Sequence, residues 1–218
     1  MDFNGNSNII IHDNSSHSIR YIKKKDNKLK NLIKYIGTLS YSLHSDSYSF
    51  IVNTIISQML SNKVSSIISS KLLYLCGNKL TPETINKISI SELRSIGISN
   101  KKSEYIIDFS NFYISSSNYF NKINTLPDKD IIHELIKLRG IGIWSAKMYL
   151  IFVLDRLDVL PFEDGAFLQS FHWLYPHITL EKSSIQLYCN CWKPYSSIAS
   201  RYLYKALDTG LIKSNIPI

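Results

Sequence analysis

Apolar residues recur at helical spacing along most of this chain. In the segment 26–36 they fall at i, i+3, i+4 and i+7, the spacing that places them on one face of a helix. These residues are Leu29, Leu32, Ile33 and Ile36. Clean alternation of apolar and polar residues, which would indicate strands, is absent. The pattern predicts an all-α fold.

Capping residues and proline mark where helices begin. Thr81 before Pro82 supplies an N-cap and a proline at the first helical position, and Asp128 is expected to cap a helix that ends at Leu138. Residues 1–18 show no clear period and are expected to form a loose or weakly paired lead-in. The other helices are expected to begin near 26 and 99 and to span 50–60, 64–76, 88–97, 143–154, 165–173, 180–192 and 195–209.

The charge balance favours a polyanionic partner. The 218 residues include 25 Lys and Arg against 17 Asp and Glu, which gives a formal net charge of +8. Seven of the basic residues lie between Arg20 and Lys34 together with one acid, and the simplest interpretation is the solvated face of a helix. Charge by itself leaves an ordinary basic surface as an equal alternative.

The cysteines and the short apolar runs argue against a metal-centred protein and against a membrane-spanning one. Cys76, Cys189 and Cys191 are an odd number without the spacing of a metal-ligand cluster, so we expect no structural metal, no iron–sulfur centre and reduced thiols. The apolar runs are too short to cross a membrane. Residues 1–18 are polar and lack the pattern of a signal peptide.

A Gly-x-Gly turn between two expected helices is the most specific local motif. Gly140-Ile141-Gly142 separates the helices, and Ile143 starts the second one. The first amides of a helix have no partner within it and lie at the positive end of its dipole, so they can bind a phosphate. Glycine permits the dihedral angles of the turn and the close approach of the phosphate. A lone motif of this kind is more often a helix–turn–helix corner that serves packing alone. The neighbouring residues must show whether this one binds phosphate.

Motifs along the chain resemble those of the helix-hairpin-helix (HhH-GPD) DNA glycosylases, in the branch of the DNA-3-methyladenine glycosylase II (alkylbase) enzymes. After the hairpin comes a matching stretch at 158–164. Three further matches are an early helix with a Gln-containing turn at 50–61, a short helix and its corner at 93–102, and the C-terminal Trp-Lys-Pro-Tyr helix at 192–204. The resemblance covers about residues 26–210.

The resemblance implies an all-α, two-lobed fold with a substrate cleft between the lobes. The lobe with the hairpin is expected at about 50–160, and the segments 26–50 and 161–218 complete the fold. Residues 1–25 are then an N-terminal lead-in that is partly in the second lobe or disordered.

Asp164 matches the catalytic aspartate of the family. Loss of the base builds positive charge on the sugar, and one nearby carboxylate can stabilise that charge while water attacks C1′. Asp is also a favoured N-cap for the helix that follows, and both roles can hold at once. Glu163 is the rival carboxylate, but the spacing of the family motif from Pro161 selects Asp164.

Trp144 stands where bifunctional relatives carry the lysine that attacks C1′ and leads to strand cleavage. The resemblance therefore implies a monofunctional enzyme. Lys147, three residues after Trp144, could be taken for that lysine. Its position on the helix is expected to point its side chain away from C1′. Trp144, Met148 and Tyr204 are expected to line a pocket for an electron-poor alkylated base. Core packing remains an alternative for Trp144 and Tyr204.

The resemblance also implies where DNA is held. Gln58 and Met59 match the turn that fills the gap left by a flipped base, with a buried methionine as the alternative. The expected hairpin contacts are Gly140, Gly142, Ile143 and Ser145, with Lys137, Arg139 and Lys147 steering the phosphates. The monovalent cation of the family would lie on the carbonyls of Ile136, Leu138 and Gly140. No other cofactor is expected, and His133 and His172 are interpreted as ordinary packing or surface residues.

The expected reaction is hydrolysis of the N-glycosidic bond of alkylated purines, such as 3-methyladenine, in duplex DNA during base excision repair. The enzyme is expected to act as a monomer away from membranes, in the cytoplasm and nucleoid of a bacterium or the nucleus of a eukaryote. Two alternatives remain open. One is a glycosylase for another damaged base, such as uracil or a deaminated or oxidised purine. The other is a helix-hairpin-helix DNA-binding protein without catalysis.

Overall fold

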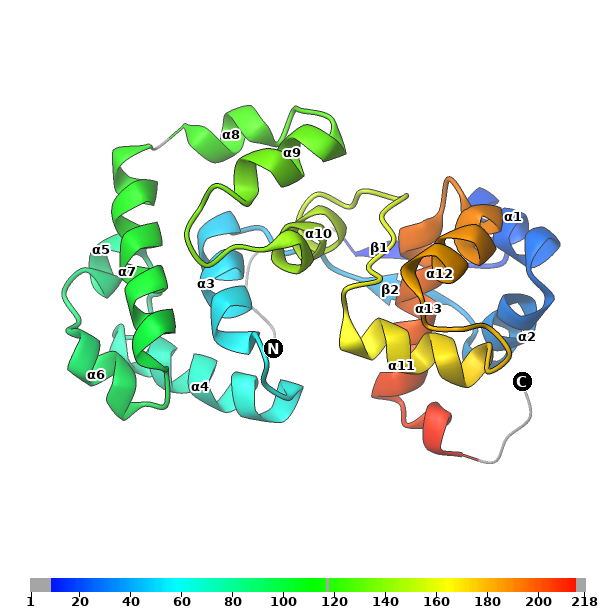
Figure 1. Cartoon of the computed structure of the whole chain (residues 1–218), viewed down its shortest axis with the longest axis horizontal. Helices are drawn as coiled ribbons and strands as arrows, with labels where there is room; N and C mark the ends of the chain where they lie inside the picture. The colour runs from blue at the N-terminus through cyan, green and yellow to red at the C-terminus, as the bar shows by residue number, and fades with distance from the viewer. Residues whose placement is uncertain (1–8, 117, 215–218) are drawn as a thin grey trace. The chain divides into compact units, whose positions relative to one another are not determined.

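The computed structural model describes residues 9–116 and 118–214, which fold into two compact units (Figure 1). We call His44–Tyr149 the hairpin unit. We call the described residues before it and after it, 9–43 and 150–214, the terminal unit. The expected limits of the hairpin lobe, about 50 and 160, lie a few residues later in the chain than these. Each unit has its own core and is described by itself.

The hairpin unit is entirely helical in its described residues. Its helices are α3 (Ser47–Ser57), α4 (Asn62–Leu75), α5 (Pro82–Ile85), α6 (Ile90–Ser95), α7 (Asn100–Ser115), α8 (Tyr119–Ile123) and α9 (Asp128–Leu135), followed by the start of α10 (Ile143–Phe152). Thr81 and Ser89 each form a capping box at a helix start, and the Ser99 side chain caps α7. The apolar α3 packs against α7 and supplies much of the core of this unit.

The terminal unit combines helices from both ends of the chain with one short ribbon. Its elements are β1 (Ile10–His12), α1 (His17–Lys25), α2 (Asn27–Ile36), β2 (Leu39–Tyr41), α11 (Gly165–Leu174), α12 (Lys182–Cys189), the 3₁₀ turn η1 (Asn190–Trp192), α13 (Ser196–Asp208) and the 3₁₀ turn η2 (Leu211–Lys213). The central helix α13 packs against α2 and α11. Apolar residues of these three helices form one buried cluster.

A buried carboxylate ties the two sequence-distant halves of the terminal unit together. Asp26 is 4% exposed and caps α2 by accepting a hydrogen bond from the Leu29 amide at 3.0 Å. Its second oxygen accepts hydrogen bonds from the Tyr175 hydroxyl at 2.7 Å and the Trp192 indole at 2.8 Å. A carboxylate can stay buried at low cost only when such donors replace water. Asp26 therefore joins the N-terminal helices to the C-terminal ones.

The helical fold predicted from the sequence is confirmed, with local corrections. The described chain contains a two-stranded antiparallel ribbon in which Ile10 pairs with Tyr41. Strands of three residues are too short to show alternation in a sequence. The lead-in was also expected to run to residue 25, yet α1 is a helix there, held by Ile19 and Ile22. Within the described residues, no helix combines the length and apolar character needed to cross a membrane.

Helix α9 is shorter than expected at its C-terminal end. It was expected to run from a cap at Asp128 to Leu138, but its N-cap is Pro127 and it ends at Leu135. The residues 136–142 form the turn that leads to α10. The hairpin loop is therefore longer than the Gly-x-Gly motif by itself suggests.

Candidate functional site

The two hairpin glycines occupy different environments. Gly140 has a φ of +85°, and a Cβ placed on it would lie 2.4 Å from Cδ2 of Tyr105 on α7. A Cβ on Gly142 would meet nothing within 4 Å. Gly140 is thus required by the turn and by its packing against Tyr105. The open space at Gly142 lies beside the N-terminus of α10, where the helix amides can meet an anion.

Gln58 braces the hairpin from the C-terminal end of α3. Its side-chain amide donates to the Gly140 carbonyl at 2.8 Å and lies 3.4 Å from the Ser145 hydroxyl. Ser145 is 1% exposed, so the residue is buried and its hydroxyl lies within the protein beside Gln58. Gln58 was predicted to enter the gap left by a flipped base. To do so, its side chain would have to give up the hydrogen bond that holds the hairpin in place.

Met59 is the exposed member of the Gln-Met pair. Its side chain is fully exposed, and its backbone adopts a φ of 60°. A left-handed conformation costs a residue with a Cβ about 1–2 kcal/mol. The alternative of a buried methionine is wrong. An unbranched apolar side chain held out into water at a strained position is what a wedge between bases requires.

Lys102 holds the backbone of this turn. Its ammonium donates to the Ile56 carbonyl at 2.8 Å and to the Gln58 carbonyl at 2.6 Å, the last acceptors of α3. Burial lowers the pKa of Lys102 below that of an ordinary lysine. The sequence placed Lys102 in a family-like corner but assigned it no role. Only the packing of α7 against α3 shows what it binds.

The basic residues around the hairpin are less available for DNA than expected. Arg139 donates to Asp108 at 2.7 Å and to Glu104 at 3.1 Å, and its guanidinium lies 5.3 Å from the centre of the Tyr105 ring. Lys137 forms an ion pair with Glu134, and Lys147 is only 9% exposed. That these three residues steer phosphates stays a prediction. In the structure, Arg139 joins the hairpin to α7 through Asp108 and Glu104.

The DNA-contact residue and the two pocket residues predicted on α10 differ in exposure. Ile143, at the first helical position, is 49% exposed, whereas Trp144 is partly buried. Met148, about one turn after Trp144, is 6% exposed. Ile143 therefore offers an apolar surface next to the open position of Gly142, and Trp144 remains a pocket candidate.

Asp164 caps α11 in the terminal unit. Its Oδ1 accepts a hydrogen bond from the Phe167 amide at 2.8 Å. The predicted capping role is confirmed by this contact. The bond fixes the carboxylate at the positive end of the helix, where a negative charge is stabilised. Glu163 is partly buried beside it in the chain.

Tyr204 lies close to Asp164, although forty residues separate them in the chain. Burial, and then the charge of the Asp164 carboxylate, raise the pKa of the Tyr204 hydroxyl well above 10. That hydroxyl is buried without a partner at hydrogen-bond geometry, and the tyrosine ring lies 6.1 Å from that of Phe152. The structure thus brings together, within one unit, two residues that the sequence predicted for the site.

Arg201 is a neighbour that sequence reasoning missed. It is 7% exposed and donates to the Ile151 carbonyl at 2.7 Å. Its guanidinium lies 3.6 Å from the centre of the Tyr41 ring and 4.8 Å from that of Phe152. Its charge acts against the raised pKa of Tyr204. Its position three residues before Tyr204 on α13 was the available signal, since residues at that spacing share a helix face.

The carbonyls predicted to hold a monovalent cation already accept hydrogen bonds in part. The Leu138 carbonyl accepts from the Ile141 amide at 3.0 Å, and the Gly140 carbonyl accepts from Gln58. A carbonyl oxygen has two lone pairs, so each could still contribute one to a cation. In the described residues, no group of three or more His, Cys, Asp or Glu could hold a metal ion.

Comparison with known proteins settles the family. Residues 52–195 match the model of the HhH-GPD superfamily base excision DNA repair protein. The chain belongs to this superfamily. The family predicted from the hairpin, the stretch 158–164 and the C-terminal helix is confirmed.

Named HhH-GPD relatives share stretches of this sequence. The putative DNA-3-methyladenine glycosylase YfjP of Bacillus subtilis is 31% identical over 111 residues, which cover 49% of this chain and 38% of the relative. The DNA-3-methyladenine glycosylase 1 of Schizosaccharomyces pombe is 32% identical over 82 residues, which cover 37% of this chain and 36% of the relative. The matches thus span less than two fifths of these curated relatives.

Solved HhH-GPD structures match over most of the chain. The DNA-3-methyladenine glycosidase of Bacillus halodurans has a TM-score of 0.77 and 29% identity, over 93% of this chain and 94% of that one. The Schizosaccharomyces pombe 3-methyladenine DNA glycosylase Mag1, solved in complex with abasic DNA, has a TM-score of 0.81 and 23% identity, over 88% of this chain and 97% of that one. The second likeness concerns the fold alone.

Proposed function

We propose that this HhH-GPD protein is a monofunctional DNA glycosylase that hydrolyses the N-glycosidic bond of alkylated purines of the 3-methyladenine class in duplex DNA. One observation carries the proposal: the Asp164 carboxylate is fixed by the Phe167 amide next to Tyr204. The names of the relatives from Bacillus and Schizosaccharomyces support the same substrate class.

The chemistry asks for one fixed negative charge. When the bond between C1′ and the base breaks, the base leaves with the electron pair and C1′ gains oxocarbenium character. Asp164 would stabilise that positive charge without reorganising, because the helix cap already holds its carboxylate. Water then bonds to C1′ through its oxygen and passes its extra proton to bulk solvent, which leaves a hydroxyl on C1′. An alkylated purine is cationic, so the electron pair neutralises it and it needs no proton to leave.

Tyr204 suits the recognition of such a base. Its raised pKa keeps the hydroxyl protonated at neutral pH, so the ring remains a neutral aromatic surface next to a carboxylate. Aromatic faces attract cations through the ring quadrupole. A site of this kind favours a cationic lesion over a neutral one.

Water is the proposed nucleophile because no lysine occupies the position of Trp144. Lys147, the nearest alternative in the sequence, is 9% exposed. We expect no covalent adduct when the protein is treated with borohydride in the presence of damaged DNA. A stable adduct would contradict the monofunctional mechanism.

A monovalent cation on the carbonyls of Ile136, Leu138 and Gly140 remains part of the proposal. It would use the second lone pairs of Leu138 and Gly140 and would add positive charge beside the helix amides. Replacing K⁺ by tetramethylammonium at constant ionic strength should then weaken DNA binding. Equal affinity in the two salts would exclude the cation.

The decisive test is the release of 3-methyladenine from methylated duplex DNA by the wild type and by Asp164→Asn. Asn keeps the helix cap but removes the charge, so the variant should fold normally and lose release. Asp46 caps α3 in the same way through the amides of Tyr48 and Ser49, and Asp46→Asn is the matched control. Release that survives in Asp164→Asn would refute the assigned role. Release of uracil, hypoxanthine or 8-oxoguanine instead of 3-methyladenine would favour another lesion, and no release of any base would favour a binding protein.

A further inference from the structure

We propose that the exposed basic face of α1 and α2 is a second DNA-binding surface, which holds the phosphate backbone of the duplex whether or not a lesion is present. The inference rests on the proposed function in that DNA is the polyanion. We call this face the α1–α2 surface. Its residues are Arg20, Lys23, Lys24, Lys25, Lys28, Lys30 and Lys34.

The α1–α2 surface carries most of the excess positive charge of the chain. Seven basic residues and one acid between positions 20 and 34 give a balance of +6, whereas the formal charge of all 218 residues is +8. The one acid is Asp26, which is buried and bound by Tyr175 and Trp192. The positive charge is therefore concentrated on 15 of the 218 residues, and the one acid among them does not lie at the surface.

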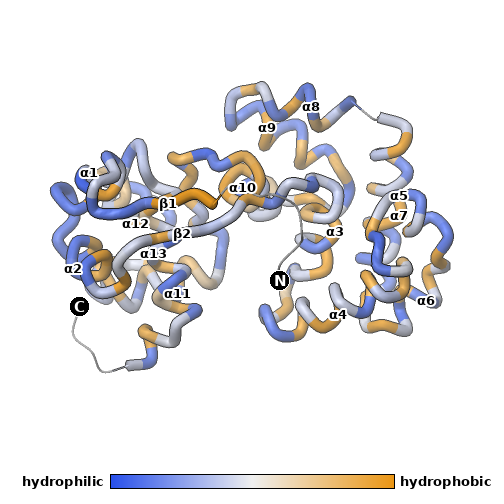
Figure 2. The backbone as a smooth tube through the Cα atoms, turned by 180° about the vertical axis from the view of Figure 1, so that it is seen from behind, coloured by the Kyte–Doolittle hydropathy of each residue, from blue (hydrophilic) through white to orange (hydrophobic). Residues whose placement is uncertain are grey.

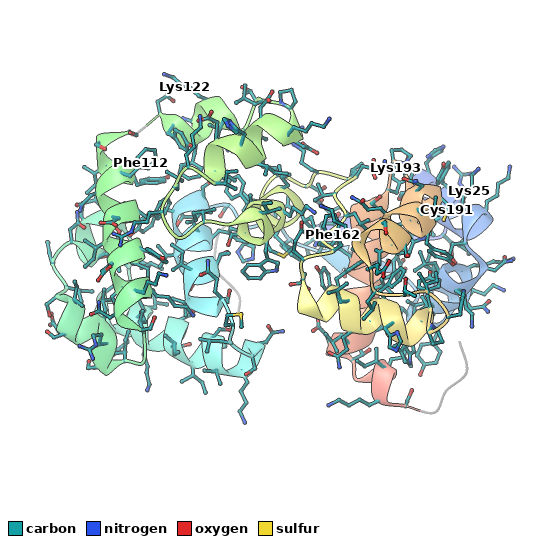
Figure 3. All side chains as sticks on the ribbon, in the orientation of Figure 1. Lys25, Phe112, Lys122, Phe162, Cys191 and Lys193 are labelled. Atoms are coloured by element: carbon teal, nitrogen blue, oxygen red, sulfur yellow. The ribbon has the colours of Figure 1, made fainter. Side chains whose placement is uncertain are left out.

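The fold turns this charge outward. The helices α1 and α2 bury most of their apolar residues. The basic residues occupy positions between these apolar residues along the sequence. Figure 2 shows the hydrophilic positions alternating with hydrophobic ones along both helices. The exposed members of the surface are Arg20, Lys24, Lys25, Lys28 and Lys34, whereas Lys23 and Lys30 are partly buried. Helix α1 packs against η1, and Figure 3 labels Lys25, the last residue of α1, and Lys193, the exposed residue that follows η1.

No carboxylate neutralises these side chains. In the part of the chain that the structure describes, none of the seven forms an ion pair, and Lys23 instead donates to the Asn14 side chain at 3.0 Å. The basic residues at the hairpin behave differently, because Lys137 and Arg139 are both paired with acids. The α1–α2 surface thus supplies positive charge that the hairpin lacks.

Helix stability explains only part of the arrangement. The helix dipoles favour the three lysines in the last turn of α1 and Lys34 in the last turn of α2, but the dipole of α2 opposes Lys28 in its first turn. The pairs Arg20–Lys24 and Lys30–Lys34 place like charges four residues apart, which costs about 0.2–0.5 kcal/mol each. A polyanion in contact with the surface would relieve this repulsion.

The dimensions fit a duplex. Helix α1 has nine residues and is about 13 Å long. B-DNA carries one phosphate per 3.4 Å of axis on each strand, so about four phosphates of a strand span that length. Each phosphate contact with a lysine releases counterions and steepens the salt dependence of binding.

The test measures the affinity for an undamaged 20-base-pair duplex over a range of salt concentrations. The triple variant Lys24→Gln, Lys25→Gln, Lys28→Gln should reduce the slope of log affinity against log salt by about 2 to 3, at roughly 0.9 per lost contact. A control triple at the exposed lysines 71, 79 and 87 of the hairpin unit makes the same change in net charge. It should change the slope by less than about 1. The matching Lys→Arg triple at 24, 25 and 28 should keep the wild-type slope.

Two results would overturn the inference. Equal slopes for the two glutamine triples would mean that only total charge matters. An unchanged DNA slope with lost binding to phosphatidylserine vesicles would assign the surface to a membrane. Thermal unfolding checks that each variant is folded. The assay uses undamaged DNA, so it is independent of base release: a protein that releases no base could still show the slope change, and an active glycosylase could lack it.

Discussion

The hairpin unit and the terminal unit use their polar groups in opposite ways. In the hairpin unit, Gln58, Lys102 and Arg139 all bind groups of the protein and fix the backbone of the hairpin and of the Met59 turn. In the terminal unit, none of the seven basic side chains between positions 20 and 34 forms an ion pair within the described residues, and Asp164 lies close to the partly buried Tyr204. The first unit offers a rigid backbone shape, and the second offers charge. A glycosylase needs both, because recognition of DNA depends on positioned backbone groups and bond cleavage depends on a fixed anion.

Of the variants that test this comparison, Asp164→Asn should have the largest effect, and the effect should be on the rate of base release. Removing one preorganised electrostatic group typically lowers a rate by about 100- to 1,000-fold. Single-turnover base release should fall by that amount, and the melting temperature should change by no more than about 2 °C, because Asn is as good an N-cap as Asp. Asp46→Asn should leave release unchanged. A similar loss in both variants would mean that the effect is not specific to the charge of Asp164.

Gly140→Ala and Gly142→Ala should separate the structural part of the hairpin from its binding part. At Gly140 the alanine would clash with Tyr105 at a positive φ, so unfolding free energy should fall by about 2–4 kcal/mol. At Gly142 there is room for a methyl group, so stability should hardly change while DNA affinity falls. Denaturant titration and DNA binding measure the two effects. Normal DNA binding by folded Gly142→Ala would argue against phosphate at this helix end.

Lys102→Met should show how far the Met59 turn depends on one side chain. The variant loses two hydrogen bonds to carbonyls of α3, at about 1 kcal/mol each. Urea unfolding should report the loss, and DNA affinity should fall with it. Lys101→Met on the exposed side of the same helix is the control and should be near neutral. Unchanged stability in Lys102→Met would show that solvent replaces the ammonium easily.

Met59→Gly should raise stability and weaken function together. Glycine relieves the left-handed strain, so unfolding free energy should increase by about 1 kcal/mol. Loss of the apolar side chain should weaken binding to DNA with an abasic site, where a wedge would fill the gap. Met59→Leu should restore binding without the gain in stability. Full binding by Met59→Gly would remove Met59 from the interface.

The smallest expected effect is a pH dependence that belongs to the terminal unit. Burial lowers the pKa of His12, opposed by the charge of Asp155 and reinforced by Arg201. Above about pH 6.5 the histidine is neutral in both states, and as the pH falls toward the lowered value the unfolded chain takes up the proton first. Stability should therefore decline below about pH 6.5, and His12→Gln should lessen that decline. Melting curves at pH 7.5 and pH 5 provide the measurement. His133→Gln, at an exposed site, is the control, and an equal effect there would contradict the assignment.

The sequence by itself determined the helical character and the positions of most helix starts. Asp26, Ser99 and Asp164 act as caps as their neighbours indicated, because capping depends on contacts within three residues. The hairpin and the C-terminal motif likewise predicted the superfamily. The three-residue strands and α8 were missed, because segments this short carry too little periodicity to be recognised. Helix α1 was missed because only Ile19 and Ile22 mark its buried face.

Only the tertiary structure decided which side chains serve the site and which serve the fold. Arg139 and Gln58 were expected to meet DNA, but α7 and the hairpin engage both of them. Lys102 and Arg201 had no assigned role, although each donates to carbonyls of a distant helix. These contacts join residues 31 to 82 positions apart in the chain, and no local pattern encodes them. A sequence fixes what each side chain can bind, whereas the packing of helices decides what it meets.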